Sequence, residues 1–119
     1  MKRRETGILG ERLAKDFLKK KRYRIIETNF KCQYGEIDII ARKNEYLVFI
    51  EVRTKTSCEF GSPEESITPM KKDKIIASAS SYINTHQTGT NSWRIDFVAI
   101  EVDQKGKLVR AELIENITG

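Results

Sequence analysis

The stretch Gly35–Lys55, GEIDIIARKNEYLVFIEVRTK, decides how the chain folds. It holds two runs of β-forming residues on either side of a short polar segment, Arg42 to Glu45, which is the pattern of an antiparallel hairpin. Three acidic residues, Glu36, Asp38 and Glu51, interrupt these runs. Because acidic side chains are disfavoured in strands, their presence requires a chemical reason.

Alternation along the two strands predicts where these acids lie. Successive side chains of a strand point to opposite faces, so Glu36 shares a face with Asp38, and Glu51 shares a face with Arg53. If the turn holds two or four residues, Asp38 and Glu51 lie on the same side of the hairpin as diagonal neighbours, roughly 7–8 Å apart at Cα. The opposite, buried face is expected to contain Ile37, Ile39, Val48, Ile50 and Val52.

Two carboxylates at this spacing could bind one cation. Like charges this close repel unless they are protonated, paired with a basic group or bridged by a metal. Ligation by oxygen alone selects a hard ion such as Mg²⁺ or Mn²⁺. A metal-dependent phosphodiesterase needs such carboxylates, and it needs a cation like Arg53 to stabilise charge on the phosphate. The alternative is a sheet with one solvated face, in which Arg53 forms a cross-strand ion pair with Glu36.

The rest of the chain predicts an α/β fold in the order helix, three strands, helix, two strands. Apolar residues at helical spacing indicate a first helix from Glu5 to about Lys20, with Thr6 as its N-cap and Glu11 at the margin of its apolar stripe. Thr68 as N-cap and Pro69 at the first position open the second helix. The five strands are expected at YRIIETNF, GEIDIIA, YLVFIEVRT, WRIDFVAIEV and KLVRAELI.

A helix between the third and fourth strands predicts a parallel pair, so the central sheet should be mixed and flanked by helices. The segment CEFGSPEES before the second helix is expected to be a loop. Asp96 in the fourth strand is expected to pair with Arg94 or Arg53.

Length and charge bound the function. A chain of 119 residues is the size of one domain, so residues 1–119 are interpreted as a single unit. No apolar run could span a bilayer, and the basic start lacks the apolar region of a signal peptide, so a cytoplasmic location without membrane association is expected. The net charge of +5, with basic residues bunched at 2–4, 19–22 and at Lys71, Lys72 and Lys74, makes polyanions such as nucleic acid natural partners; the alternative is that these residues are solvated helix faces and a basic terminal tail.

Several motifs together resemble a known family. They are Gly10-Glu11, Asn29, GEIDIIA at 35–41, FIEVRTK at 49–55, Lys71, and RIDFVAI at 94–100. Over Gly7 to about Ala111 the chain resembles the YraN family of bacterial proteins, predicted members of the PD-(D/E)xK nuclease superfamily that look most like archaeal Holliday junction resolvases. The resemblance implies a restriction-endonuclease-like core and a structure-selective endonuclease that hydrolyses DNA with Mg²⁺ or Mn²⁺.

The resemblance also implies roles for single residues. Asp38 and Glu51 would be metal ligands, the Val52 carbonyl a third ligand, and Glu11 the acid that completes the site. Lys71 would contact phosphate. The other basic residues expected to bind nucleic acid are Lys55 and Lys72. Resolvase-like relatives generally act as dimers, so a homodimer is a further expectation.

Arg53 stands where the superfamily motif usually has lysine. Arginine stays protonated at any working pH, so Arg53 could clamp a phosphate or stabilise a transition state but could not act as a general base. This departure keeps a second hypothesis open, a catalytically weak or inactive nucleic-acid-binding module. A third hypothesis is a protein-interaction domain in which the hairpin carboxylates are ordinary surface.

Overall fold

The computed structural model describes residues 2–57, 61–89 and 92–118 of the chain. The elements are α1 (Arg3–Lys20), β1 (Arg24–Cys32), β2 (Gly35–Lys43), β3 (Tyr46–Thr56), the 3₁₀ helix η1 (Pro63–Ser66), α2 (Pro69–Thr85), β4 (Trp93–Val102) and β5 (Leu108–Ile114). This sequence of elements confirms the predicted order of helix, three strands, helix and two strands. The short helix η1 lies within the segment predicted to be a loop; its Ser62 and Glu65 form a capping box around Pro63.

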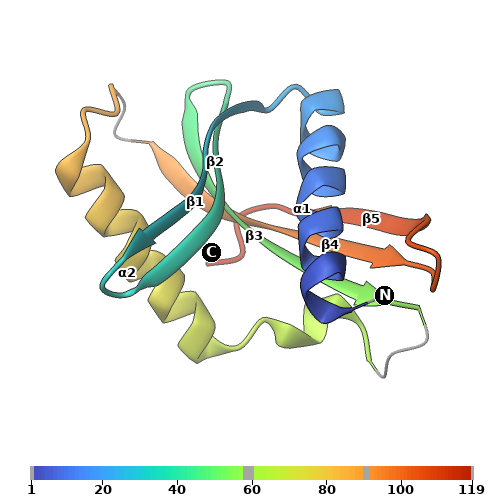
Figure 1. Cartoon of the computed structure of the whole chain (residues 1–119). Coiled ribbons are helices and arrows are strands. Elements are labelled where there is room, and N and C mark those ends of the chain that lie inside the picture. Colours follow the sequence, from blue (N-terminus) through green and yellow to red (C-terminus); the bar gives the residue numbers. More distant parts are fainter. Residues whose placement is uncertain (1, 58–60, 90–91, 119) are drawn as a thin grey trace.

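The five strands form one sheet in the order β1-β2-β3-β4-β5. Strands β3 and β4 pair in parallel, and the other neighbours pair antiparallel, which confirms the predicted mixed sheet. Helix α1 lies on one face of the sheet and α2 on the other (Figure 1). Neither described helix has the length and apolar character required for a bilayer crossing.

Each face of the sheet carries its own hydrophobic core. Ala14 and Leu18 of α1 are fully buried on one face. Ile75 and Ala79 of α2 pack on the other, together with Phe49 of β3. Both helices therefore stay attached to the sheet through burial of apolar surface.

Ile37 does not lie on the predicted face. It packs on the α2 side, although strict alternation would place it with Ile39. The cause lies in β1, where Asn29 has a left-handed φ of 54° between the paired positions Thr28–Ile39 and Phe30–Ile37. The hairpin bends at this point, so alternation is broken. The remaining residues predicted for this face do lie on the α1 side: Ile39, Val48, Ile50 and Val52.

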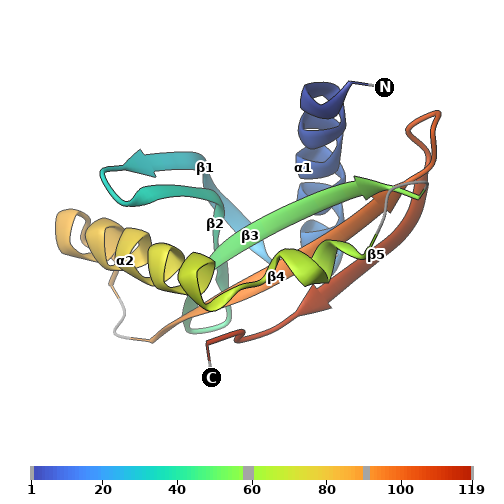
Figure 2. The ribbon, with the colours of Figure 1, turned by 90° about the horizontal axis from the view of Figure 1, so that it is seen from below.

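Strands β2 and β3 pair over only part of their length. Pairing begins at Lys43–Tyr46, next to a two-residue turn, and ends at Ile39–Ile50. Beyond that point β2 continues back to Gly35 and β3 continues to Thr56, yet they no longer pair with each other. The β1–β2 hairpin curves away from β3 there (Figure 2). The sheet consequently has an opening beside the second half of β3.

Helix α1 begins earlier than predicted. Its N-cap is Lys2, and Thr6 lies inside the first turns, where its buried hydroxyl donates to the Lys2 carbonyl at 3.1 Å. The prediction of Thr6 as N-cap was therefore wrong, because a threonine can satisfy the carbonyl four residues earlier within a helix. The predicted start of α2 is confirmed, since the Thr68 hydroxyl accepts from the Lys71 N–H at 3.3 Å.

Asp96 pairs with Arg94, as one of the two predicted alternatives stated. Arg94 Nε lies 3.0 Å from Asp96 Oδ1, and Tyr23 O–H donates to Asp96 Oδ2 at 2.8 Å. The N–H of Asn116 also donates to Asp96, at 2.9 Å. A fully buried carboxylate with these partners is a structural clamp that joins the end of α1 to the end of the chain.

An ion-pair cluster fastens η1 to the sheet. Arg110 on β5 contacts three carboxylates, those of Glu64 at 2.8 Å, Glu101 at 2.6 Å and Glu112 at 2.7 Å. Its bond to Glu64 is the largest of the effects that lower the pKa of that carboxyl to about 2. The cluster holds η1 beside the opening in the sheet.

Replacing Arg110 with glutamine should cost about 1 kcal/mol of stability at pH 7, because partly exposed ion pairs are screened by solvent. The stabilisation by Glu64 is present above its ordinary pKa of 4.5 and is lost as the pH falls towards 2. The deficit of the variant should therefore shrink between pH 5 and pH 2, measured by urea denaturation. Arg12→Gln on the exposed side of α1 is the matched control, and an equal deficit in both variants would contradict this role.

Candidate functional site

The opening between β2 and β3 frees the backbone edge of β3, and Asp38 occupies it. Asp38 Oδ2 accepts a hydrogen bond of 2.7 Å from the Val52 N–H, replacing the missing strand partner. The N–H and C=O of one strand residue point to the same edge, so the Val52 carbonyl also faces the opening. The residue predicted as a third ligand thus has its backbone turned towards the predicted carboxylates.

Asp38 and Glu51 form a carboxylate pair. The last paired positions of β2 and β3 are Ile39 and Ile50, and Asp38 and Glu51 are the next residues of the two strands. The two-residue turn fixes this register without offset, so it does not produce the diagonal placement that we predicted. Burial is the main cause that raises the pKa of Asp38 to about 8, and the neighbouring Glu51 side chain adds to it.

Glu11 of α1 faces the carboxylate pair from across the opening. Its Oε1 accepts a hydrogen bond of 3.0 Å from the Asn29 side-chain amide. Burial is the main cause that raises the pKa of Glu11, and the charge of Asp38 adds to it. The structure thus places the three acids that the sequence analysis selected around one opening, one from a helix and two from neighbouring strands.

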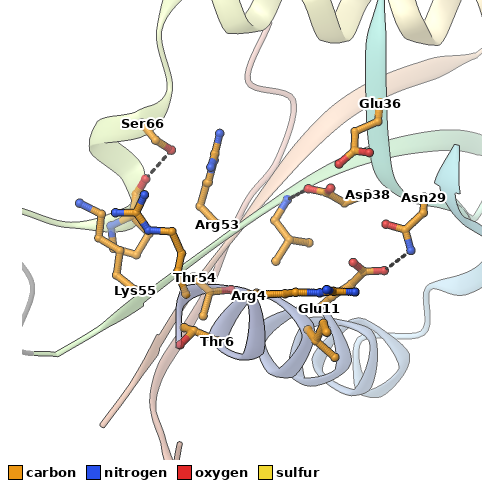
Figure 3. A pocket seen from close by; sticks show the side chains of 15 residues that line it. Arg4, Thr6, Glu11, Asn29, Glu36, Asp38, Arg53, Thr54, Lys55 and Ser66 are labelled. Atoms are coloured by element: carbon orange, nitrogen blue, oxygen red, sulfur yellow. Dashed lines mark hydrogen bonds between the residues drawn. The ribbon is translucent and has the colours of Figure 1, made fainter. Parts of the chain in front are cut away.

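A groove of about 540 Å³ runs past Glu11 and Asp38, between α1, β3 and η1. We call it the α1 groove (Figure 3). Acidic and amide side chains gather at one end of it, and Arg53 and Lys55 lie towards η1. Its lining residues are Arg3, Arg4, Thr6, Gly7, Ile8, Glu11, Asn29, Glu36, Asp38, Val52, Arg53, Thr54, Lys55, Pro63 and Ser66.

Arg53 lies at the rim of the carboxylate pair. Its Nε is 4.0 Å from Glu51 Oε2, and its side chain is 44% exposed against 18% for Glu51. The cross-strand ion pair with Glu36, the alternative that the sequence left open, is not among the ion pairs of the described residues. An exposed guanidinium beside half-buried acids is available for an anion that enters the groove.

The predicted basic residues of α2 lie on the other side of Glu51. Lys71 and Lys72 border a small hollow with Glu51, and Lys71 also borders a second one with Arg53. Lys55 lies within the α1 groove, beyond Arg53 along β3. All three lysines predicted to bind nucleic acid therefore lie around the acids, on both sides of β3.

The donor set fits a hard divalent cation in its chemistry. The carboxylate pair and the Val52 carbonyl offer only oxygen, which Mg²⁺ and Mn²⁺ prefer. Among residues 2–57, 61–89 and 92–118, no group of three or more Asp, Glu, His or Cys side chains is close enough to form a ready metal centre. Glu11 therefore faces the carboxylate pair without forming a three-acid cluster with it, and the metal ligands stay a prediction.

Asn29 and Glu36 line the site without a predicted function there; sequence reasoning gave Asn29 only a place among the motif residues and Glu36 only a possible ion pair with Arg53. Asn29 combines a left-handed backbone with the amide that contacts Glu11, and asparagine tolerates that conformation better than most residues. Its place among the motif residues was the available signal. Glu36 lines the groove because the bend at Asn29 turns this part of β2 towards α1 and away from β3.

Replacing Asn29 with glycine should raise the pKa of Glu11. Glycine keeps the left-handed backbone, whereas the amide whose hydrogen bond lowers that pKa is lost. A carboxyl titration of Glu11 followed by NMR measures the shift. Asn44→Gly in the β2–β3 turn makes the same change at another left-handed asparagine, with φ 55°, and should leave Glu11 unmoved. An unchanged Glu11 in the Asn29 variant would show that this hydrogen bond does not hold the acid.

Fold and site together define a small mixed α/β protein whose sheet opens around a carboxylate pair. A family model described as Uncharacterised protein family UPF0102 matches residues 10–100, a span that contains these acids. The chain belongs to this family, which is the YraN family that its motifs resemble.

Relatives in the same family match the chain over nearly its whole length. A UPF0102 protein of Dehalococcoides mccartyi is 50% identical over 117 residues, covering 98% of this chain and 95% of that protein. A UPF0102 protein of Moorella thermoacetica is 39% identical over 115 residues, covering 97% and 96%. One of Syntrophomonas wolfei is 42% identical over 106 residues, covering 88% and 92%. The similarity therefore includes both strands and the helix that carry the acids.

Proposed function

We propose that the protein is a metal-dependent, structure-selective endonuclease that hydrolyses phosphodiesters of DNA on a restriction-endonuclease-like fold. The observation that carries this proposal is the carboxylate pair at the open edge of β3. Two half-buried acids side by side repel one another when both are ionised, and a divalent cation would remove that repulsion. Glu11 across the opening and the basic residues around it supply the remaining chemistry.

The residues of the chain take distinct roles in this proposal. Asp38, Glu51 and the Val52 carbonyl would hold Mg²⁺ or Mn²⁺, with Glu11 on the opposite side. Such an ion lowers the pKa of water and offsets charge on the phosphate. Arg53 stabilises the charge that builds on the phosphate but, being always protonated, moves no proton.

The second candidate function is a nucleic-acid-binding module that keeps the fold without efficient cleavage. The specific observation in its favour is Arg53 in the position of the usual lysine, next to Glu51. This candidate predicts binding that weakens steeply with salt, because Lys and Arg displace counterions from the phosphates, and it predicts little dependence on Asp38.

The decisive experiment is cleavage of end-labelled single-stranded, duplex, flap and four-way-junction DNA with Mg²⁺, Mn²⁺ or EDTA. Products that require the metal and disappear in Glu51→Gln would support the endonuclease and identify its substrate class. Binding without products, unchanged in Glu51→Gln, would favour the module. Absence of both binding and cleavage at low salt would leave the protein-interaction hypothesis.

A further inference from the structure

A second hollow opens beside Glu51, on the α2 side of the sheet. It has a volume of about 200 Å³, and we call it the α2 hollow. Arg53 and Glu36 line both this hollow and the α1 groove, so the two cavities adjoin at the carboxylate pair. The polar residues of the α2 hollow that matter here are Glu36, Glu51, Arg53, Lys71, Lys74 and Ser78.

The charge of the α2 hollow favours an anion. Lys71 and Lys74 follow one another around α2 by three residues, so both side chains lie on the same side of the helix. With Arg53 they bring three positive groups to a hollow that is also lined by two acids, Glu36 and Glu51. Lys71 also belongs to the first turn of α2, where the helix dipole adds positive potential.

Ser78 supplies an independent sign that a ligand belongs there. The residue is 1% exposed, and its hydroxyl oxygen has no hydrogen-bond partner of ordinary geometry among the described residues. The neighbouring Cys32 thiol is only a weak partner. Gly35 opposite carries no side chain, and even an added Cβ would stay 3.7 Å from the hydroxyl oxygen. A buried hydroxyl with only a weak thiol partner is poorly satisfied, and an oxygen-rich ligand in the hollow would satisfy it better.

We propose that the α2 hollow is a phosphate subsite that holds the polynucleotide backbone on the far side of the carboxylate pair from the α1 groove. Lys71 and Lys74 neutralise the phosphate, and the Ser78 hydroxyl donates a hydrogen bond to one of its oxygens. A strand then crosses β3 and is bound on both sides of the acids, as cleavage within a strand requires. This inference rests on the proposed function and adds Lys74 and Ser78 to it.

The test is the binding of fluorescent single-stranded and four-way-junction oligonucleotides in EDTA, as a function of salt. Lys74→Ala should raise Kd about fivefold or more and lower the salt slope by about one. Its matched control is Lys105→Ala in the exposed β4–β5 turn, which removes the same charge outside the α2 hollow. This variant should bind with the Kd and salt slope of the wild type. Equal effects of the two lysine variants would overturn the subsite.

Ser78→Ala separates ligand binding from structure. It should raise Kd about threefold while the Tm stays unchanged or increases, because the variant removes a poorly satisfied buried group. Ser80→Ala, two residues along the same helix, is the control and should change neither quantity. Unchanged affinity in Ser78→Ala would show that the hydroxyl serves packing only and would overturn its role.

Competition identifies the source of the phosphate. The proposal predicts that inorganic phosphate and nucleoside monophosphate displace the oligonucleotide only at concentrations far above its own Kd. Variants that lose affinity for inorganic phosphate but keep it for the oligonucleotide would overturn the backbone subsite. If the wild type binds no polynucleotide, the proposed function is overturned together with the subsite. If the wild type cuts DNA but the Lys74→Ala and Lys105→Ala variants bind it with equal affinity, only the subsite is overturned.

Discussion

Replacing Asp38 with asparagine is expected to reduce metal-dependent cleavage by about 100-fold or more, the scale on which a single group that stabilises charge in a transition state acts. The asparagine can still accept the 2.7 Å hydrogen bond from the Val52 N–H, so the edge of β3 stays satisfied. What it removes is the charge available to a cation. Single-turnover cleavage with saturating Mn²⁺ measures the effect apart from substrate binding.

The same variant should be more stable than the wild type in EDTA at high pH. The pKa of Asp38 is raised from 3.8 to about 8, so between these values the folded protein binds more protons than the unfolded chain. Wild-type stability therefore falls as the pH rises through this range and stays low above it. Asparagine does not titrate, and at pH 9 the variant should gain roughly 2 kcal/mol, or about 6–10 °C in Tm.

Added Mg²⁺ or Mn²⁺ should make the wild type more stable than the Asp38→Asn variant. A cation that binds only the folded protein stabilises the wild type by mass action, and the asparagine variant should gain much less. Asp16→Asn makes the same chemical change on the exposed side of α1 and should respond to metal as the wild type does. A wild-type Tm indifferent to both pH and divalent ions, together with full activity of the Asp38 variant, would place the chemistry elsewhere.

Sequence reasoning predicted the elements and the proximity of two of the acids because both depend on local rules, whereas the role of Glu11 came from the family resemblance. Periodicity assigned the helices and strands, and the helix between β3 and β4 required the parallel pair that the structure contains. Alternation also brought Asp38 and Glu51 to one place. These inferences hold wherever a strand is regular.

The errors lie where tertiary packing overrides local rules. The left-handed Asn29 bends the hairpin, moves Ile37 to the other core and brings Glu36 into the α1 groove, and no periodic pattern announces such a bend. Ser78 reads as an ordinary polar position of an amphipathic helix, although it is buried with only the weak Cys32 thiol as a partner. Its significance depends on what lies opposite, which only the assembled sheet defines.

At Gly10, tertiary packing opposes the local preference for alanine in a helix. In an isolated helix, alanine is more favourable than glycine by about 1 kcal/mol. Gly10 is buried where α1 crosses β3, however, and a Cβ there would overlap the Thr54 side chain, approaching its Cβ and Cγ2 atoms to 2.6 Å. Real side chains do not approach so closely, so the helix would have to move.

Gly10→Ala is therefore expected to destabilise the protein by about 2 kcal/mol and to carry the adjacent Glu11 away from the carboxylate pair, with loss of cleavage. Gly7→Ala, on the same helix with no atom within 4 Å of the added Cβ, should instead stabilise it by up to about 1 kcal/mol. Urea denaturation of both variants separates helix propensity from packing. Thr54→Gly removes the obstructing atoms, so the Gly10→Ala/Thr54→Gly double variant should lose less stability than the two single losses combined. If the Gly10→Ala variant is as stable as the Gly7→Ala variant, α1 does not approach β3 this closely. The placement of Glu11 opposite the carboxylate pair would then be wrong as well.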